Sequence, residues 1–201
     1  MAGKLVVIEG MDGAGTTTQT QKLKAHLQSN GYRVLSSAEP TGSELGMTIR
    51  KLLSMPLEKE PDLLASLALC FAADRMQHIH SIIRPALKEN DFVVLDRYVL
   101  SSLVYQGLHL PTTFVKEINR YILKPDLTIV LDVDVKIAEE RLSLRASTKD
   151  FFESKELLKK IKSRYLHFAH DDINSTVLVD ASGGVDRVHS HIVNVISDKL
   201  L

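Results

Sequence analysis

The sequence predicts an α/β fold in which helices cover both faces of a five-stranded parallel sheet. Three observations support this prediction. Short runs rich in valine, isoleucine and leucine alternate with longer amphipathic stretches along the 201 residues, in the order expected of a doubly wound domain. Three of the short runs are nearly continuous in apolar residues, as strands covered on both faces are. The first run also leads through a glycine-rich turn into a helix.

Each predicted strand is short and mostly bounded by polar or glycine residues: 5–9, 34–39, 92–96, 127–133 and 176–181. In the first predicted helix, Leu23 and Leu27 share one face, and Gly31 is placed to end it. Pro61 can open a long helix, because proline fits the first helical turn. No internal repeat or long linker divides the chain, so we expect a single domain over 1–201. The predicted helices are 17–29, 43–54, 61–87, 111–123, 135–145, 153–169 and 185–200.

Composition and charge narrow the class of protein. Lysine plus arginine and aspartate plus glutamate both number 25, so the net charge is zero. A nucleic-acid-binding protein more often carries a basic surplus, so we expect no nucleic-acid partner. The single cysteine, Cys70, cannot form an intrachain disulfide, which favours a reduced compartment. No apolar stretch reaches the ~18 residues of a membrane span, and the N-terminus lacks the apolar core of a signal peptide. We therefore expect a cytoplasmic protein with no membrane attachment.

The glycine-rich turn after the first strand has the features of a phosphate-binding loop. Glycines let the backbone turn tightly and bring successive N–H groups toward phosphate oxygens, and the following helix adds its partial positive charge. Thr17 offers a hydroxyl to Mg²⁺. The alternative is a strand–helix turn with a purely structural role. The loop residues expected to bind ATP and its phosphates are Gly10, Met11, Asp12, Gly13, Ala14, Gly15, Thr16, Thr17 and Thr18.

The loop lacks the lysine that the phosphate-loop pattern places between its last glycine and the threonine. Thr16 occupies that position. The lysine normally reaches the transferring phosphate and offsets its developing charge. By analogy with the loss of one preorganised donor, its absence is expected to lower the rate by about 10²–10³. Another cation nearby can recover part of this loss.

Two further segments carry candidate site residues. The buried run at 92–96 ends in Asp96, which can orient Mg²⁺ or its water, and Arg97 can form a forked contact with phosphate. The alternative is a turn-capping aspartate with a surface partner.

Phe71 and Arg75 are four residues apart on a predicted helix, so they share a face. The ring can stack on a base whose carbonyl edge the guanidinium binds. The alternative is a core phenylalanine beside a salt-bridged arginine.

Taken together, these segments resemble the thymidylate kinase family, whose members phosphorylate dTMP. The resemblance extends over essentially the whole chain. Its most specific part is the DRY–SS–YQG cluster, which stands in phase with FAADR. The matching stretches are EGMDGAGTTTQ at 9–19, EPTGSELGMTIRKLL at 39–53, FAADRMQH at 71–78, LDRYVLSSLVYQG at 95–107 and KPDLTIVLDVDVKIAEERLSLR at 124–145.

The resemblance implies a P-loop kinase that transfers the γ-phosphate of ATP to dTMP with Mg²⁺. It also implies a homodimer formed through helices such as 61–87. The implied catalytic residues are Asp12, Arg97 and Arg145, and the implied metal residues are Thr17 and Asp96. A lid over ATP is implied at about 141–153, with Arg141 near the phosphates, and Ala181 to Gly183 near adenine. The implied dTMP-binding residues are Glu39, Arg50, Phe71, Arg75, Arg97, Ser102, Tyr105 and Gln106.

More specific roles follow from the same resemblance. Phe71 would stack on thymine, and Arg75 would bind a base carbonyl. Arg50 would hold the dTMP phosphate, while Tyr105 would crowd the sugar 2′ position and favour deoxyribose. Arg97 would bridge both phosphate groups.

Three departures from the family pattern remove cations: Thr16, Ala38 and Phe151 stand where basic residues are usual. We expect Arg97, together with Arg141 and Arg145, to replace the loop lysine. Lys149 is a further candidate. The nucleoside-binding positions are all in pattern, which favours an active kinase. The alternatives are a catalytically weak or inactive nucleotide-binding protein on the same fold and a kinase for another monophosphate. The later lysines are expected to form a solvated stripe: Lys155, Lys159, Lys160 and Lys162.

Overall fold

A computed structural model of the chain describes residues 3–55, 60–144, 154–171 and 175–201. Within these residues all strands pair in parallel in one five-stranded sheet, in the order β2-β3-β1-β4-β5. This confirms the predicted α/β fold. The strands are β1 (Lys4–Gly10), β2 (Val34–Ala38), β3 (Phe92–Asp96), β4 (Leu127–Asp132) and β5 (Thr176–Asp180).

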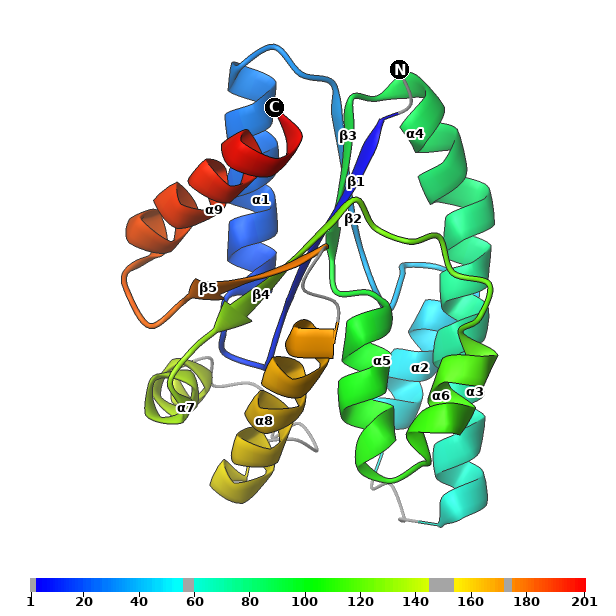
Figure 1. Cartoon of the computed structure of the whole chain (residues 1–201). Helices are drawn as coiled ribbons and strands as arrows, with labels where there is room; N and C mark the ends of the chain where they lie inside the picture. Colours follow the sequence, from blue (N-terminus) through cyan, green and yellow to red (C-terminus); the bar gives the residue numbers. More distant parts are fainter. Residues whose placement is uncertain (1–2, 56–59, 145–153, 172–174) are drawn as a thin grey trace.

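Helices lie on both faces of the sheet (Figure 1). One face carries α1 and α9, and the other carries the long helical column of α3 and α4. No helix in the described ranges is long and apolar enough to cross a membrane. The α-helices are α1 (Thr16–Ser29), α2 (Glu44–Leu53), α3 (Pro61–His78), α4 (Arg84–Glu89), α5 (Val99–Tyr105), α6 (Thr112–Ile118), α7 (Val135–Ser143), α8 (Lys155–Asp171) and α9 (Val185–Leu200).

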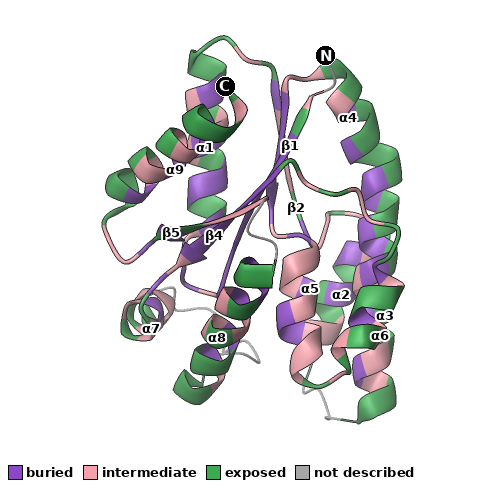
Figure 2. Cartoon of the chain, viewed as in Figure 1, coloured by how far each residue is buried: buried purple, intermediate pink, exposed green. Residues whose placement is uncertain are grey.

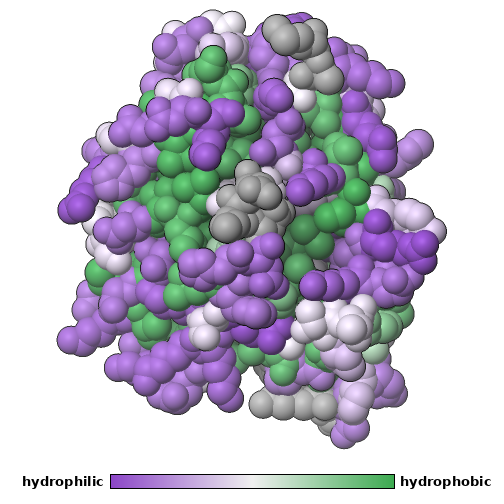
Figure 3. All heavy atoms as spheres, in the orientation of Figure 1, coloured by the Kyte–Doolittle hydropathy of each residue, from purple (hydrophilic) through white to green (hydrophobic). Residues whose placement is uncertain are grey.

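Alternation along the central strand divides the core into two layers. Val6 and Ile8 pack with residues of α1, α8 and α9, whereas Leu5 and Val7 pack with Ile79 and other residues of the long helical column. Because successive strand side chains point to opposite faces, an apolar run such as β1 is buried on both. Figure 2 shows the resulting buried sheet between partly exposed helices. In Figure 3, hydrophilic residues cover most of the region of α7 and α8.

The helix predicted over 61–87 is not regular throughout. A π-helical turn, η1 (Ile79–Ile83), separates α3 from α4. Pro85 explains this difference, because proline has no N–H and its ring would clash with the carbonyl of Ser81, four residues earlier. The wider π turn avoids that geometry: the N–H of Arg84 donates to the carbonyl of Ile79, five residues back.

Two other predictions near the site need correction. The helix predicted over 111–123 ends at Ile118, where Asn119 caps it and its Nδ2 donates to the carbonyl of Val115. No helix was predicted between the strand at 92–96 and the helix at 111–123, where the structure forms α5 and a short 3₁₀ turn, η2 (Gln106–Leu108). α5 has only seven residues, so its apolar spacing is too short to be distinguished from an irregular segment.

The sheet register brings three loops to one edge. Asp96, at the end of β3, lies opposite Ile8 of β1 and Ala38 of β2. Beyond these pairs, the N–H of Arg97 donates to the carbonyl of Ile8, and the N–H of Glu39 to that of Asp96. The loops after β1, β2 and β3 therefore start side by side at the carboxyl edge, where open α/β sheets bind ligands.

Candidate active site

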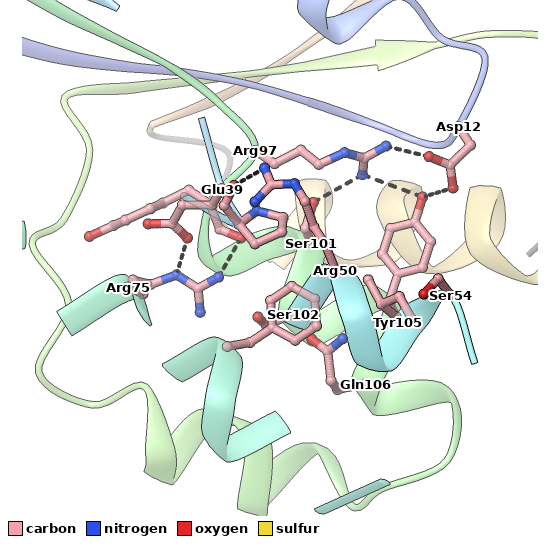
Figure 4. Close-up of a pocket in the computed structure, with 14 residues that line it drawn as sticks. Asp12, Glu39, Arg50, Ser54, Arg75, Arg97, Ser101, Ser102, Tyr105 and Gln106 are labelled. Atoms are coloured by element: carbon pink, nitrogen blue, oxygen red, sulfur yellow. Dashed lines mark hydrogen bonds and ion pairs between the residues drawn. The ribbon is translucent and has the colours of Figure 1, made fainter. Parts of the chain in front are cut away.

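A cavity of about 340 Å³ lies at this edge of the sheet (Figure 4). All of the residues expected to bind dTMP line it, together with Asp12 of the glycine-rich loop. They come from the loops after β1, β2 and β3 and from α2, α3, α5 and η2. The other lining residues are Pro40, Leu53, Ser54, Tyr98 and Ser101, of which Leu53, Ser54, Tyr98 and Ser101 were not expected as site residues.

The glycine-rich loop has the backbone of an anion-binding turn. Gly13 and Gly15 have φ values of 82° and 95°, in the left-handed region that glycine tolerates best. A Cβ at Gly13 would also lie 2.7 Å from the carbonyl oxygen of Ala138. Gly15 supplies no side-chain cap to α1, so N–H groups of the first helical turn are left for a ligand anion. Thr16, which occupies the position of the missing lysine, is buried.

The groups expected to bind Mg²⁺ meet beside this loop. Thr17 Oγ1 donates to Asp96 Oδ2 at 2.5 Å. The other carboxylate oxygen, Asp96 Oδ1, is buried and has no hydrogen-bond partner among the described residues. A buried carboxylate oxygen without a partner is unfavourable, and a hard cation favours carboxylate and hydroxyl oxygens, completed by phosphate and water. The residues present therefore fit Mg²⁺ bound together with a nucleotide.

Arg97 lies between the loop and the cavity. Its Nη2 donates to Asp12 Oδ1 at 2.8 Å, and the hydroxyl of Tyr105 donates to Asp12 Oδ2 at 2.9 Å (Figure 4). Arg97 has a φ of 68°, which is uncommon for a residue with a Cβ and is typical of functional sites. Its side chain is 20% exposed, so the guanidinium can meet a bound anion.

A second set of groups fixes the other side of Arg97. Nη1 donates to Ser101 Oγ at 3.2 Å and to the hydroxyl of Tyr165 at 3.2 Å. Both hydroxyls contact Glu9, which is fully buried at the end of β1. Burial raises the pKa of the Glu9 carboxyl, although hydrogen bonds from Ser101 and the charge of Arg97 oppose this shift. Tyr165 was not predicted as a site residue, because on its own helix it is one more residue of the buried face.

Arg75 is the most deeply buried cation of the site, with a side chain 1% exposed. Its Nε donates to Glu39 Oε2 at 2.8 Å, its Nη1 to Asn119 Oδ1 and its Nη2 to the carbonyl of Tyr98 at 3.1 Å. The other carboxylate oxygen of Glu39 contacts His78 Nδ1 at 3.1 Å. Within the described part of the chain, these bonds use three of the five N–H groups of Arg75, which leaves two for a ligand.

The part of the cavity lined by Phe71, Ser102 and Gln106 offers groups suited to a planar base. Phe71 is half-buried and lines the cavity together with Ser102 and Gln106. Gln106 Oε1 is buried and has no hydrogen-bond partner in the described ranges. Because an amide can present its oxygen or its nitrogen, Gln106 can pair with either an N–H or a carbonyl of a base.

Arg50, from α2, is an exposed cation in the lining of the cavity. Its guanidinium donates to the backbone carbonyls of Pro40 and Thr41. The loop that carries these carbonyls is held in turn by Asp74, which accepts from the N–H of Thr41 at 2.8 Å and from Ser43 Oγ at 2.9 Å. Arg50 remains exposed and can turn toward a ligand phosphate.

In the later part of the chain, two basic side chains bind oxygens of the protein itself. Arg141 donates to the carbonyls of Gly13, Ala181 and Gly183, so it links the glycine-rich loop to the loop after β5. The expectation of a solvated stripe is wrong for Lys162, whose Nζ lies 2.6 Å from Asp132 Oδ1 and donates to the carbonyl of Val133. Arg145, Lys149 and the rest of the expected lid from 145 to 153 lie outside the described residues.

Comparison with known proteins agrees with this geometry. The family model described as thymidylate kinase matches residues 8–192. A probable thymidylate kinase of Pyrococcus horikoshii is 37% identical over 204 residues, which cover 100% of this chain and 99% of that protein. Those of Methanobrevibacter smithii and Methanocaldococcus jannaschii are 40% and 38% identical, over 96% of this chain in each case and over 93% and 95% of their own lengths.

Proposed function

The chain belongs to the thymidylate kinase family, and we propose that it transfers the γ-phosphoryl group of ATP to dTMP, giving dTDP and ADP. One observation carries this proposal. A single cavity gathers every residue that the family resemblance assigns to dTMP, and Asp12 joins that cavity to the phosphate loop. Donor and acceptor would therefore meet at Arg97.

The cavity supplies contacts for each part of dTMP. Phe71 offers a face for stacking, while Arg75 and Gln106 offer the polar groups that a pyrimidine edge can pair with. The Tyr105 hydroxyl is held by Asp12 on the sugar side, where it would oppose a 2′-hydroxyl. Arg50, in the cavity lining, supplies positive charge for the 5′-phosphate.

The reaction needs alignment and charge neutralisation. An oxygen of the dTMP phosphate attacks the γ-phosphorus, the bond from that phosphorus to the bridging oxygen breaks, and ADP leaves. Arg97 orients the acceptor phosphate and offsets the repulsion between the two anions. Thr17 and Asp96 would hold Mg²⁺, which neutralises charge on the donor phosphates when bound. N–H groups at the start of α1 would bind the same phosphates.

A substrate panel tests this function. The purified protein is supplied with Mg-ATP and with dTMP, dUMP, dCMP or dGMP, and each diphosphate is quantified by chromatography. The proposal predicts the highest kcat/KM for dTMP, and a Phe71→Ala variant with a raised KM for dTMP. Binding of dTMP without any diphosphate product would identify a non-catalytic nucleotide binder. A higher kcat/KM for another monophosphate would assign a different substrate.

A homodimer and a cytoplasmic location are further parts of the proposal. Leu69 and Met76 are 49% and 38% exposed and seven residues apart, so they share a face of α3. Met47 of the adjoining α2 is also exposed. Covering these side chains with a second copy would remove apolar surface from water. Analytical ultracentrifugation tests the proposed homodimer, and a monomer at assay concentration would contradict it.

The cytoplasmic location rests on the intracellular substrates ATP and dTMP.

A further inference from the structure

We propose that Tyr165, contributed by α8, is a positioning residue that holds the Arg97 guanidinium in its productive orientation. The proposal rests on the proposed kinase function, in which Arg97 lies between two phosphate groups. It assigns a role to a residue outside the segments that carry the nucleotide-binding motifs. The observation behind it is a set of hydroxyls between Arg97 and a buried carboxylate.

Arg97 needs external support to point in one direction. An arginine side chain has several rotatable bonds, and a contact to Asp12 alone would fix only one end of its planar guanidinium. The second end is fixed by three hydroxyls. Arg97 Nη1 lies 3.2 Å from Ser101 Oγ, 3.2 Å from the Tyr165 hydroxyl and 3.4 Å from the Tyr105 hydroxyl.

Tyr165 is well suited to this role because it is rigid. Its side chain is among the most buried of the described residues, and its ring packs edge-on against Tyr105 with centroids 6.3 Å apart. Burial raises the pKa of the Tyr165 hydroxyl well above its ordinary value, so the hydroxyl keeps its proton at neutral pH. It can therefore accept from Arg97 and still donate to a neighbour.

Glu9 is the acceptor for the Tyr165 hydroxyl, and its position is fixed. The Tyr165 hydroxyl lies 2.9 Å from Ser101 Oγ and 3.3 Å from Glu9 Oε2. Glu9 also accepts from the N–H of Tyr98 at 2.8 Å and from that of Ser101 at 3.1 Å, at the start of α5. The carboxylate thus caps a helix whose own N-cap offers no side-chain bond, and its position is fixed by the backbone.

Neighbouring residues on α8 fix where the Tyr165 hydroxyl sits. Lys162 binds Asp132 and the carbonyl of Val133 at the end of β4. Arg164 donates to the carbonyls of Leu103 and Val104 in the last turn of α5. These polar contacts on both sides attach this part of α8 to the sheet and to the helix that carries Ser101. The orientation of Arg97 therefore depends on a helix from the last third of the chain.

The position of Arg97 carries more weight here than in a loop that has its lysine. Thr16 provides no charge to the donor phosphate, so a misaligned Arg97 leaves developing charge uncompensated. Loss of one hydrogen bond to a charged group changes an equilibrium or a rate by about 10-fold. We expect Tyr165→Phe to lower kcat by about that factor, with less than a threefold change in the KM for dTMP.

The test combines kinetics with a direct readout of Arg97. Tyr165→Phe is measured alone and together with Arg97→Lys, which cannot bridge Asp12 and the hydroxyls at once. Positioning predicts a non-additive pair, with Tyr165→Phe having little further effect once Arg97 is replaced. The matched control is Tyr32→Phe, since Tyr32 packs edge-on against Phe92 at the amino end of the sheet. An unchanged kcat in Tyr165→Phe, or additive effects, would overturn the proposal.

A second readout is independent of turnover. In protein labelled with ¹⁵N-arginine, the Arg97 side-chain resonances are assigned by their loss in Arg97→Lys. Tyr165→Phe is expected to shift them and speed their exchange with water, whereas Tyr32→Phe leaves them unchanged. If the wild type makes no dTDP, the kinase function fails while this measurement still decides the role of Tyr165. Unchanged Arg97 resonances in Tyr165→Phe would reject that role.

Discussion

Glu9 and Arg97 lie at the carboxyl ends of neighbouring strands, and the hydroxyls of Ser101 and Tyr165 lie between them. This arrangement keeps a buried carboxylate satisfied by four donor groups without direct pairing to the arginine. Arg97 remains at the cavity surface, where Asp12 is its ion-pair partner. A charged group that is fixed but not fully neutralised is what transition-state stabilisation requires.

Glu9 should make stability depend on pH in a defined direction. Burial raises its pKa in the folded protein above the ordinary value of 4.5. At pH values between 4.5 and the folded pKa, the folded state therefore binds more protons than the unfolded state does. The contribution of Glu9 to stability is therefore greatest below pH 4.5 and falls as pH rises toward the folded pKa. We expect the free energy of unfolding of the wild type to fall over this range relative to Glu9→Gln.

Urea denaturation of both proteins from pH 4 to pH 8 measures this difference. The Glu117→Gln variant is a matched comparison, because Glu117 is an exposed carboxylate paired with Arg120 on the protein surface. A difference between wild type and Glu9→Gln that stays constant across the range would show that the Glu9 pKa is not raised.

At the scale of elements, the end of α6 positions the base-binding wall. Asn119 caps α6 and accepts from the buried Arg75, so helix termination and guanidinium placement depend on the same side chain. Asn119→Ala should destabilise the fold by about 1–3 kcal/mol, because a buried charged donor loses its acceptor. It should also raise the KM for dTMP. Arg120→Ala is the adjacent control, since Arg120 is exposed and pairs only with Glu117 and Tyr121 among the described residues.

Thermal or urea denaturation and dTMP kinetics on these two variants measure both effects. Equal stability and equal KM values in Asn119→Ala and Arg120→Ala would contradict a role of Asn119 in placing Arg75.

The elements also show what the sequence could and could not predict. Long apolar runs such as 92–96 identify strands, because burial on both faces leaves a clear pattern. The motifs identified the cavity wall, since Phe71 and Arg75 lie one turn apart on a helix. The π turn before Pro85 was missed, because proline is compatible with several ways of breaking regular hydrogen bonding. Tyr165 was missed because its partner Glu9 is 156 residues away in sequence.

For the molecule as a whole, parallel strand order makes the site. β1 lies in the centre of the sheet, between β3 and β4, so the phosphate loop adjoins Asp96 and Arg97 on one side and Asp132 on the other. α8 then closes the arrangement from the far end of the chain, through Lys162 and Tyr165. The loop lacks a lysine, but Arg97, a cation from outside the loop, is held beside it by Asp12 and Tyr165.

The central claim is that this threonine-containing loop supports phosphoryl transfer with Arg97 as a required cation. The most direct measurement is the rate of dTDP formation from dTMP and Mg-ATP by the wild type, Arg97→Ala and Thr16→Lys. We predict turnover by the wild type and a loss of about 10²–10³ in Arg97→Ala, without any requirement for Thr16→Lys. Full activity in Arg97→Ala, or activity that emerges only in Thr16→Lys, would contradict the claim.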